Sequence, residues 1–133
     1  MTLDIDPKCM PDICIDLMAW EYTDFGLAPP DFVHFSPPCT QYSIARSKAK
    51  TPRDLDGADA LVQRCLDIIA YWRPKYWFME NPQTGLLKTR DVVRGIPYVD
   101  LDYCMYIAPY RKRTRIWTNT AWTPRPLCNH ASH

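Results

Sequence analysis

Hydrophobic and polar positions along the chain predict several short strands and one long helix. Apolar side chains recur three and four residues apart from Asp54 to Trp72, which is typical of a helix with one buried face, and Pro74 ends it. A second, shorter helix is expected from Gly85 to Val93. Strands are predicted at residues 2–6, 12–17, 31–36, 76–79, 98–106 and 115–120. Because strands and helices alternate along the chain, we predict an α/β fold.

Polar side chains follow three of the predicted strands at the points where those strands end. Asp4 and Asp6 close the first strand, Cys39 follows the third, and Glu80 comes directly after the apolar segment 76–79. The carboxyl ends of parallel strands meet at one edge of a sheet, where ligands bind in open α/β folds. We therefore expect these groups to share one site.

The length of 133 residues allows one small domain. Sixteen Lys and Arg side chains oppose fifteen Asp and Glu, so the net charge of +1 neither favours nor excludes a polyanionic partner. The charge is unevenly spread, because the first 31 residues hold seven acidic side chains and a single basic one, Lys8. The rest of the chain therefore carries an excess of positive charge.

No apolar run approaches the roughly 18 residues needed to cross a bilayer, and the first residues lack the basic start and apolar stretch of a secretion signal. We therefore expect an intracellular protein without a membrane partner. Its six scattered cysteines are expected to be free thiols. Cys128, His130 and His133 fit no zinc-ligand spacing well, so we predict no metal site.

The residue types alone leave the candidate motifs open to ordinary structural roles. The segment Ser-Pro-Pro-Cys-Thr-Gln-Tyr-Ser forms a rigid turn that presents the Cys39 thiol, although a lone cysteine is more often a small buried apolar residue. Glu80 suits either a reacting carboxylate or a capping group. The basic run 111–115 suits either nucleic acid or a solvated face. A zinc-dependent nucleobase deaminase is excluded, because Tyr42 stands where a second cysteine is needed.

Three motifs in order, SPPCTQYS (36–43), MENP (79–82) and YRKRTRIW (110–117), resemble the Pro-Cys, Glu-Asn and Gln-x-Arg-x-Arg motifs of the cytosine carbon-5 DNA methyltransferases. Each motif is short, but their order and their spacing of tens of residues make the joint match specific. The resemblance implies a partial catalytic domain over residues 1–126, with residues 127–133 a frayed tail. It also implies a Rossmann-like sheet, the cofactor S-adenosylmethionine and double-stranded DNA as the substrate.

The resemblance assigns four catalytic residues. Cys39 is the nucleophile that adds to carbon-6 of the cytosine, which makes carbon-5 electron-rich enough to attack the methyl group of the cofactor. Glu80 protonates or holds the endocyclic nitrogen of the ring. Arg113 and Arg115 contact the flipped nucleotide and its phosphate, and they are candidates for the positive field that a thiolate needs.

The resemblance also implies a cofactor site at Asp4, Ile5, Asp16 and Pro38. Asp4 accepts the ribose hydroxyls, Ile5 lies against the adenine face, and Asp16 takes the adenine amino group. From the residues alone, ordinary polar residues at strand ends are the better interpretation of these positions.

For the DNA, the resemblance implies a set of substrate-binding residues, namely Ser36, Ser43, Asn81 and Arg111. Asn81 is further expected to orient the loop beside Glu80. Four basic residues after the cysteine suit either the DNA backbone or a solvated loop: Arg46, Lys48, Lys50 and Arg53.

The chain also departs from the family pattern. Thr40, Pro82 and Arg111 replace the Gln, Val and Gln that are common in the family, and these are tolerable variants. The glycine-rich first motif is missing, and with it the strand that lies between those ending at Asp4 and Ser36. We therefore predict an incomplete sheet and a fragment of the enzyme. The alternatives are a non-catalytic DNA-binding remnant, or one half of a split enzyme whose complementary chain supplies the missing strand.

Overall fold

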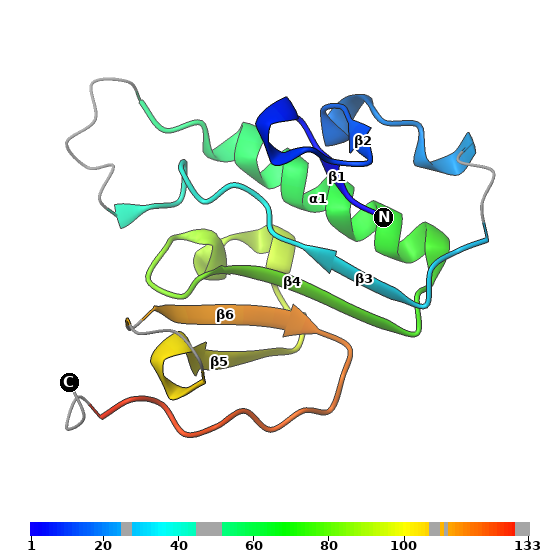
Figure 1. Ribbon diagram of the computed structural model, residues 1–133. Coiled ribbons are helices and arrows are strands. Elements are labelled where there is room, and N and C mark those ends of the chain that lie inside the picture. Colours follow the sequence, from blue (N-terminus) through cyan, green and yellow to red (C-terminus); the bar gives the residue numbers. More distant parts are fainter. Residues whose placement is uncertain (25–27, 45–51, 107–109, 111, 130–133) are drawn as a thin grey trace.

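The computed structural model describes residues 1–24, 28–44, 52–106, 110 and 112–129, and within them it contains two sheets and one long helix (Figure 1). The smaller sheet is a parallel pair, β1 (Leu3–Asp4) and β2 (Ile13–Cys14). The larger sheet has the order β3-β4-β6-β5, with strands β3 (Phe32–Phe35), β4 (Tyr76–Pro82), β5 (Tyr98–Asp102) and β6 (Arg113–Thr118). The predicted α/β class is confirmed, and its Rossmann-like assignment stays a prediction.

The helix α1 (Leu55–Trp72) forms where the apolar spacing predicted it. Asp54 caps its start by accepting a hydrogen bond from the Gly57 main-chain NH at 2.9 Å. Arg73 ends it in the left-handed conformation, with φ of 51°, directly before Pro74. The buried positions on α1 are Val62, Cys65 and Ile68, which lie three apart as the predicted buried face requires.

Strand β4 is longer than the predicted segment 76–79, because its two neighbours end at different places. The parallel strand β3 pairs with β4 only as far as Phe35 opposite Met79. The antiparallel strand β6 continues the pairing to Thr114 opposite Pro82. Glu80 therefore lies within β4 and not after it, which corrects the prediction.

Other boundaries also differ from the predicted ones, since the strands expected over 2–6 and 12–17 are the two-residue strands β1 and β2. The helix expected from Gly85 to Val93 consists of two short 3₁₀ helices. The strand expected over 98–106 ends at Asp102, where the chain turns, and the strand expected over 115–120 runs from Arg113 to Thr118. The 3₁₀ helices of the described chain are η1 (Pro7–Cys9), η2 (Leu17–Ala19), η3 (Tyr22–Asp24), η5 (Leu87–Thr89), η6 (Asp91–Val93) and η7 (Tyr103–Met105).

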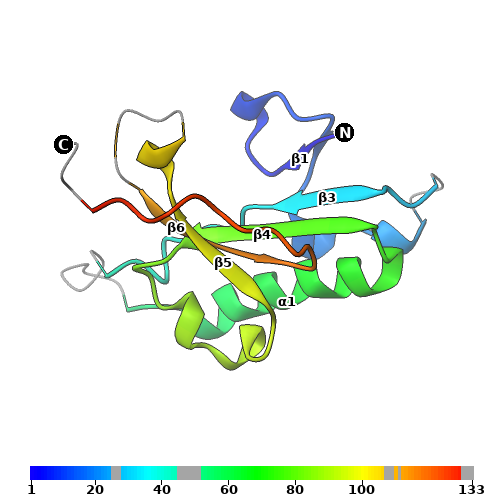
Figure 2. The same cartoon turned by 90° about the horizontal axis from the view of Figure 1, so that it is seen from below.

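The core lies between α1 and one face of the larger sheet, as Figure 2 makes visible. Met79 and Trp117 face each other across β4 and β6 on this side and are fully or almost fully buried. Side chains alternate along a strand, so the opposite face carries the intervening residues of β3, β4 and β6. This second face is apolar and open, with a hollow of about 560 Å³ lined by Phe32, His34, Tyr76, Phe78, Ile116, Thr120 and Trp122.

The two sheets are separate in the described part of the chain. Strand β3 pairs there with β4 alone, so its other edge has no partner strand, and β1 pairs with β2 alone. β1 and β3 are the strands between which the sequence predicted a gap. An unpaired edge carries a row of main-chain donors and acceptors that can accept a further strand.

The tail that was predicted to fray from residue 127 is anchored at Cys128, which is buried and whose main-chain NH donates to Asp102 Oδ2 at 2.8 Å. His130 and His133 lie outside the described residues. The domain boundaries stay a prediction. The six cysteines all lie among the described residues and form no disulfide, as expected. Across the described ranges, α1 and the short helices are too short or too polar to span a bilayer.

Candidate active site

The residues after β3 form a turn, Ser36–Ser43, that carries Cys39 on its exposed side. Pro37 is buried, whereas Pro38, Cys39 and Thr40 are exposed to solvent. The Tyr42 main-chain NH donates to the Cys39 carbonyl at 3.0 Å and closes the turn. Two consecutive prolines restrict the backbone before the cysteine. The sequence therefore produces a rigid turn with an accessible thiol, and we call this segment the Pro-Cys turn.

Asn81 ties the Pro-Cys turn to strand β4. Its amide Nδ2 donates to the Pro37 carbonyl at 2.9 Å, and the asparagine side chain is only 1% exposed. The parallel register that pairs Phe35 with Met79 brings the start of the turn level with Glu80. Cys39 and Glu80 thus come from segments that meet at the same edge of the sheet. The expected role of Asn81 in orienting the loop beside Glu80 stays a prediction.

Glu80 offers a carboxylate oxygen that no protein group satisfies. Its Oε2 is buried and has no hydrogen-bond partner among the described residues. Asn81 Oδ1 is also buried without a hydrogen-bond partner there. A buried unpaired acceptor is costly, so such groups mark either strain or a binding site. Glu80 is paired with Ile116 in the β4–β6 register. Because neighbouring residues of a strand point to opposite faces of the sheet, the two acceptors serve different sides, and the Glu80 oxygen suits a ligand group that shares a proton with it.

The two arginines of the basic motif are held by carboxylates of β5. Arg113 donates to Asp102 from Nε at 3.1 Å and from Nη2 at 2.8 Å. Arg115 donates to Asp100 from the same two nitrogens at 2.8 and 3.0 Å. Each carboxylate raises the pKa of its arginine, so both guanidinium groups are permanently charged. The guanidinium of Arg115 also lies 3.7 Å from the ring centre of Tyr98.

The sequence reasoning missed Asp100 and Asp102. Their alternation along β5, two residues apart, matches the alternation of Arg113 and Arg115 on β6, and the antiparallel register pairs them one to one. This matched two-residue spacing of aspartates and arginines was the feature of the sequence that could have predicted the two ion pairs. Arg115 is also in register with Asn81, so these two face the α1 side of the sheet, whereas Glu80 faces the other side. Arg111 lies outside the described residues.

The remaining residues predicted to bind substrate lie on or beside the Pro-Cys turn. Ser36 is exposed and Ser43 is half-buried. Arg53 holds the far end of the turn, because its Nη1 donates to the carbonyls of Gln41 and Ser43 at 2.9 and 2.8 Å. It is thus engaged with the protein main chain. Arg46, Lys48 and Lys50 fall outside the described residues.

Three of the four residues predicted for the cofactor, Asp4, Ile5 and Asp16, lie at the ends of β1 and β2, whereas Pro38 lies on the Pro-Cys turn after β3. The Ile15 main-chain NH donates to the Asp4 carbonyl at 3.0 Å, which keeps the two strand ends side by side. Asp4 and Asp16 each accept a hydrogen bond from the main-chain NH two residues later, at 2.9 Å, so both carboxylates are oriented. The Ile5 side chain is 64% exposed. Two fixed carboxylates beside an exposed aliphatic side chain fit a nucleoside, whose hydroxyl and amino groups are donors.

Comparisons with known proteins show the family of this chain. A family model described as C-5 cytosine-specific DNA methylase matches residues 10–94, a range that includes Cys39 and Glu80. A protein of Frog virus 3 (isolate Goorha) named "Probable DNA (cytosine-5)-methyltransferase" is 37% identical over 121 residues, which is 81% of this chain and 55% of the viral protein. The chain therefore spans about half the length of that curated relative. Because the family model matches more than half of its residues, the chain belongs to the family of C-5 cytosine-specific DNA methylases.

Proposed function

We propose that this chain carries the catalytic part of a DNA methyltransferase that acts on carbon-5 of cytosine, with Cys39 as the nucleophile and S-adenosylmethionine as the methyl donor. The observation that carries the proposal is the hydrogen bond from Asn81 to the Pro37 carbonyl. It joins the exposed cysteine to the strand that holds Glu80, whose carboxylate has an unpaired buried oxygen.

In the proposed reaction, the Cys39 thiolate forms a bond to carbon-6 of the cytosine. Protonated Glu80 gives its proton to the endocyclic nitrogen as the thiolate adds, which neutralises the negative charge that builds on the ring, and it takes this proton back after the methyl transfer. When bound, S-adenosylmethionine would supply the methyl group for carbon-5 and would leave as S-adenosylhomocysteine. A water molecule then takes the proton from carbon-5, the double bond between carbon-5 and carbon-6 forms again, and the bond between sulfur and carbon-6 breaks to return the Cys39 thiolate.

Double-stranded DNA is the proposed substrate, with the cytosine turned out of the helix. Each guanidinium has five N–H donors, and the bonds from Arg113 and Arg115 to their carboxylates use only part of them. The remaining donors suit the phosphate and the flipped nucleotide, and Arg111 is proposed to act with them. Ser36, Ser43 and Asn81 complete the proposed contacts to the nucleotide.

For the cofactor, Asp4 is proposed to accept the ribose hydroxyls and Asp16 the adenine amino group. Ile5 is proposed to pack on the adenine, and Pro38 to border the cofactor from the Pro-Cys turn. The fixed orientation of both carboxylates supports these roles.

A duplex containing 5-fluorocytosine tests the nucleophile, because fluorine on carbon-5 cannot leave as a proton and the adduct is trapped. With S-adenosylmethionine and a complementary methyltransferase fragment present, we expect a protein–DNA adduct whose peptide map places the link at Cys39. Cys39→Ser should give no adduct, whereas Cys14→Ser, which changes another exposed cysteine, should react like the native protein. An adduct of unchanged yield from Cys39→Ser protein would overturn the assignment.

We further propose that a complementary chain pairs with β3 and supplies the glycine-rich motif. The unpaired edge of β3 and the apolar face beside it support this, since Phe32 and Tyr76 on that face are 58% and 45% exposed. Calorimetric titration with S-adenosylhomocysteine tests it. Binding only after a complementary methyltransferase fragment is added supports the split enzyme. Binding to the chain alone contradicts the need for a partner, and no binding under either condition favours a non-catalytic DNA-binding module.

A further inference from the structure

Tyr42 is the point at which the Pro-Cys turn meets two other parts of the fold. Its side chain is 0% exposed, although it lies only three residues from the exposed Cys39. Its main-chain NH donates to the Cys39 carbonyl at 3.0 Å, and its own carbonyl accepts a hydrogen bond from the Leu86 NH at 2.9 Å. The turn is therefore attached to the segment that follows β4 through the main chain of this residue.

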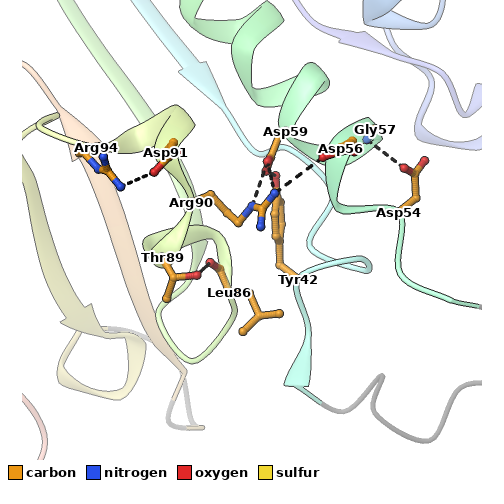
Figure 3. A network of polar contacts seen from close by, with 10 residues as sticks. All are labelled: Tyr42, Asp54, Asp56, Gly57, Asp59, Leu86, Thr89, Arg90, Asp91 and Arg94. Atoms are coloured by element: carbon orange, nitrogen blue, oxygen red, sulfur yellow. Dashed lines mark hydrogen bonds and ion pairs between the residues drawn. The ribbon is translucent and has the colours of Figure 1, made fainter.

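The Tyr42 side chain makes a second attachment, to helix α1. Its hydroxyl donates to Asp59 Oδ1 at 2.8 Å. Asp59 Oδ2 in turn accepts from Arg90 Nε at 2.9 Å and lies 2.8 Å from Arg90 Nη2. Figure 3 shows the Tyr42 hydroxyl and the Arg90 guanidinium both pointing toward Asp59, with a further ion pair from the guanidinium to Asp56. We call Tyr42, Asp59 and Arg90 the Tyr42 cluster.

The protonation states of the Tyr42 cluster keep this attachment intact. Burial, together with the hydrogen bond and the negative charge of Asp59, raises the pKa of the Tyr42 hydroxyl. Asp59 raises the pKa of Arg90 as well. The hydroxyl thus remains a donor and the guanidinium remains charged at neutral pH. Both oxygens of Asp59 are used, one by each partner.

Two anchors therefore bracket the cysteine. Asn81 holds the Pro37 carbonyl on one side, and the Tyr42 cluster holds residue 42 on the other, which leaves only residues 38–41 between them. Gly85 packs closely against the main chain of Tyr42. A Cβ added at Gly85 would lie only 3.3 Å from the Tyr42 carbonyl oxygen. A turn held at both ends has few alternative conformations, so its thiol occupies a defined position.

We propose that Tyr42, held by Asp59 and Arg90, is a positioning residue that fixes the Cys39 turn against α1 and the segment after β4. The link to catalysis rests on the proposed function, in which Cys39 is the reacting group. The positioning itself is a property of the fold and is measured without any reaction.

Hydrogen exchange of single amides in the full chain measures the positioning. Tyr42→Phe keeps the ring but removes the hydroxyl, and we expect the NH of position 42 and the Leu86 NH to exchange about tenfold faster or more, while the α1 amides of Cys65 and Ile68 change less than about twofold. Asp59→Ala should act in the same way. Asp59→Asn keeps an oxygen for the hydroxyl and should restore most of the protection. Arg94→Ala, which removes an exposed ion pair with Asp91 in the same segment, is the matched control and should change nothing.

The outcomes separate this proposal from the proposed function. Unchanged exchange at position 42 and Leu86 in both Tyr42→Phe and Asp59→Ala overturns the positioning role, as does an equal acceleration of the α1 amides, which indicates a merely structural role. The rate of adduct formation on saturating 5-fluorocytosine duplex should fall about tenfold in Tyr42→Phe with DNA affinity retained. If the native protein forms no adduct even with S-adenosylmethionine and the complementary fragment present, but the exchange pattern holds, the methyltransferase proposal fails and the positioning stands.

Discussion

Asp100 and Arg115 face each other across the β5–β6 ladder and are joined by two hydrogen bonds, at 2.8 and 3.0 Å. Their side chains are 23% and 12% exposed, so water screens the pair only partly. Asp91 and Arg94 form a pair of the same chemistry whose side chains are 83% and 78% exposed. The chain thus contains a sheltered and an exposed aspartate–arginine pair for direct comparison.

The sheltered pair is expected to be strongly coupled. A double-mutant cycle with Asp100→Ala and Arg115→Ala should give a coupling energy of about 1–3 kcal/mol in urea unfolding, because the partner left alone loses two charge-assisted bonds. The cycle with Asp91→Ala and Arg94→Ala should give about 0–1 kcal/mol. Arg115→Lys should recover little of the coupling, since an ammonium cannot form the two-point contact. Equal coupling in the two cycles would contradict this.

Asn81→Ala is expected to destabilise the protein as well as loosen the Pro-Cys turn. The substitution leaves the Pro37 carbonyl without its donor in a buried position, which costs about 1–3 kcal/mol of unfolding free energy. Gln63→Ala is the control, because it also removes a side-chain amide hydrogen bond, to Asp67, but at an exposed site. Urea titrations should show a change of about 0.5 kcal/mol or less for the control. A loss at Gln63 as large as that at Asn81 would count against the anchoring role.

Glu80→Gln is expected to separate stability from function. The native carboxylate has a buried oxygen without a partner, and a neutral amide is less costly to bury than a charge. The unfolding free energy should therefore stay constant or rise by up to about 1 kcal/mol, while adduct formation with 5-fluorocytosine DNA falls sharply. Glu21→Gln changes the other glutamate of the chain, which is exposed, and should alter neither quantity. A large loss of stability in Glu80→Gln would show that the carboxylate is satisfied within the fold.

The stability of the protein is expected to fall as the pH rises above about 9, in part because of Cys65. Burial raises the pKa of this thiol from 9.0 to about 12. Between these values the unfolded chain has released the proton that the folded chain retains, so the unfolded state gains up to about 1.4 kcal/mol per pH unit. Below pH 9 the thiol is protonated in both states and contributes no slope.

Urea unfolding at pH 8, 9 and 10 measures this slope. Cys65→Val fills a similar volume without an ionisable group and should flatten the decline above pH 9. Cys14→Ser, at an exposed cysteine, should leave the decline as it is in the native protein. If the curve for Cys65→Val coincides with the native one, the buried thiol does not contribute to the loss of stability in alkali.

Local pattern was enough to find helix α1 and the central strand. The three-and-four spacing of apolar residues ahead of Pro74 is a property of neighbouring residues, and a helix satisfies its main-chain groups within the same segment. The order of Cys39, Glu80 and the arginines was equally readable from the sequence, because a motif is a run of adjacent residues. The three motifs therefore indicated the family before any contact in the structure was known.

The tertiary structure decided how far β4 extends and which groups hold the site. Asn81 meets Pro37 across 44 positions of sequence, and Tyr42 meets Asp59 across 17. Such contacts depend on strand register and on how α1 packs against the sheet, which no local spacing encodes. The sequence by itself therefore determined the local elements and the chemistry-bearing residues, and only the tertiary structure decided which of those residues pair, because pairing is set by packing between segments far apart in the chain.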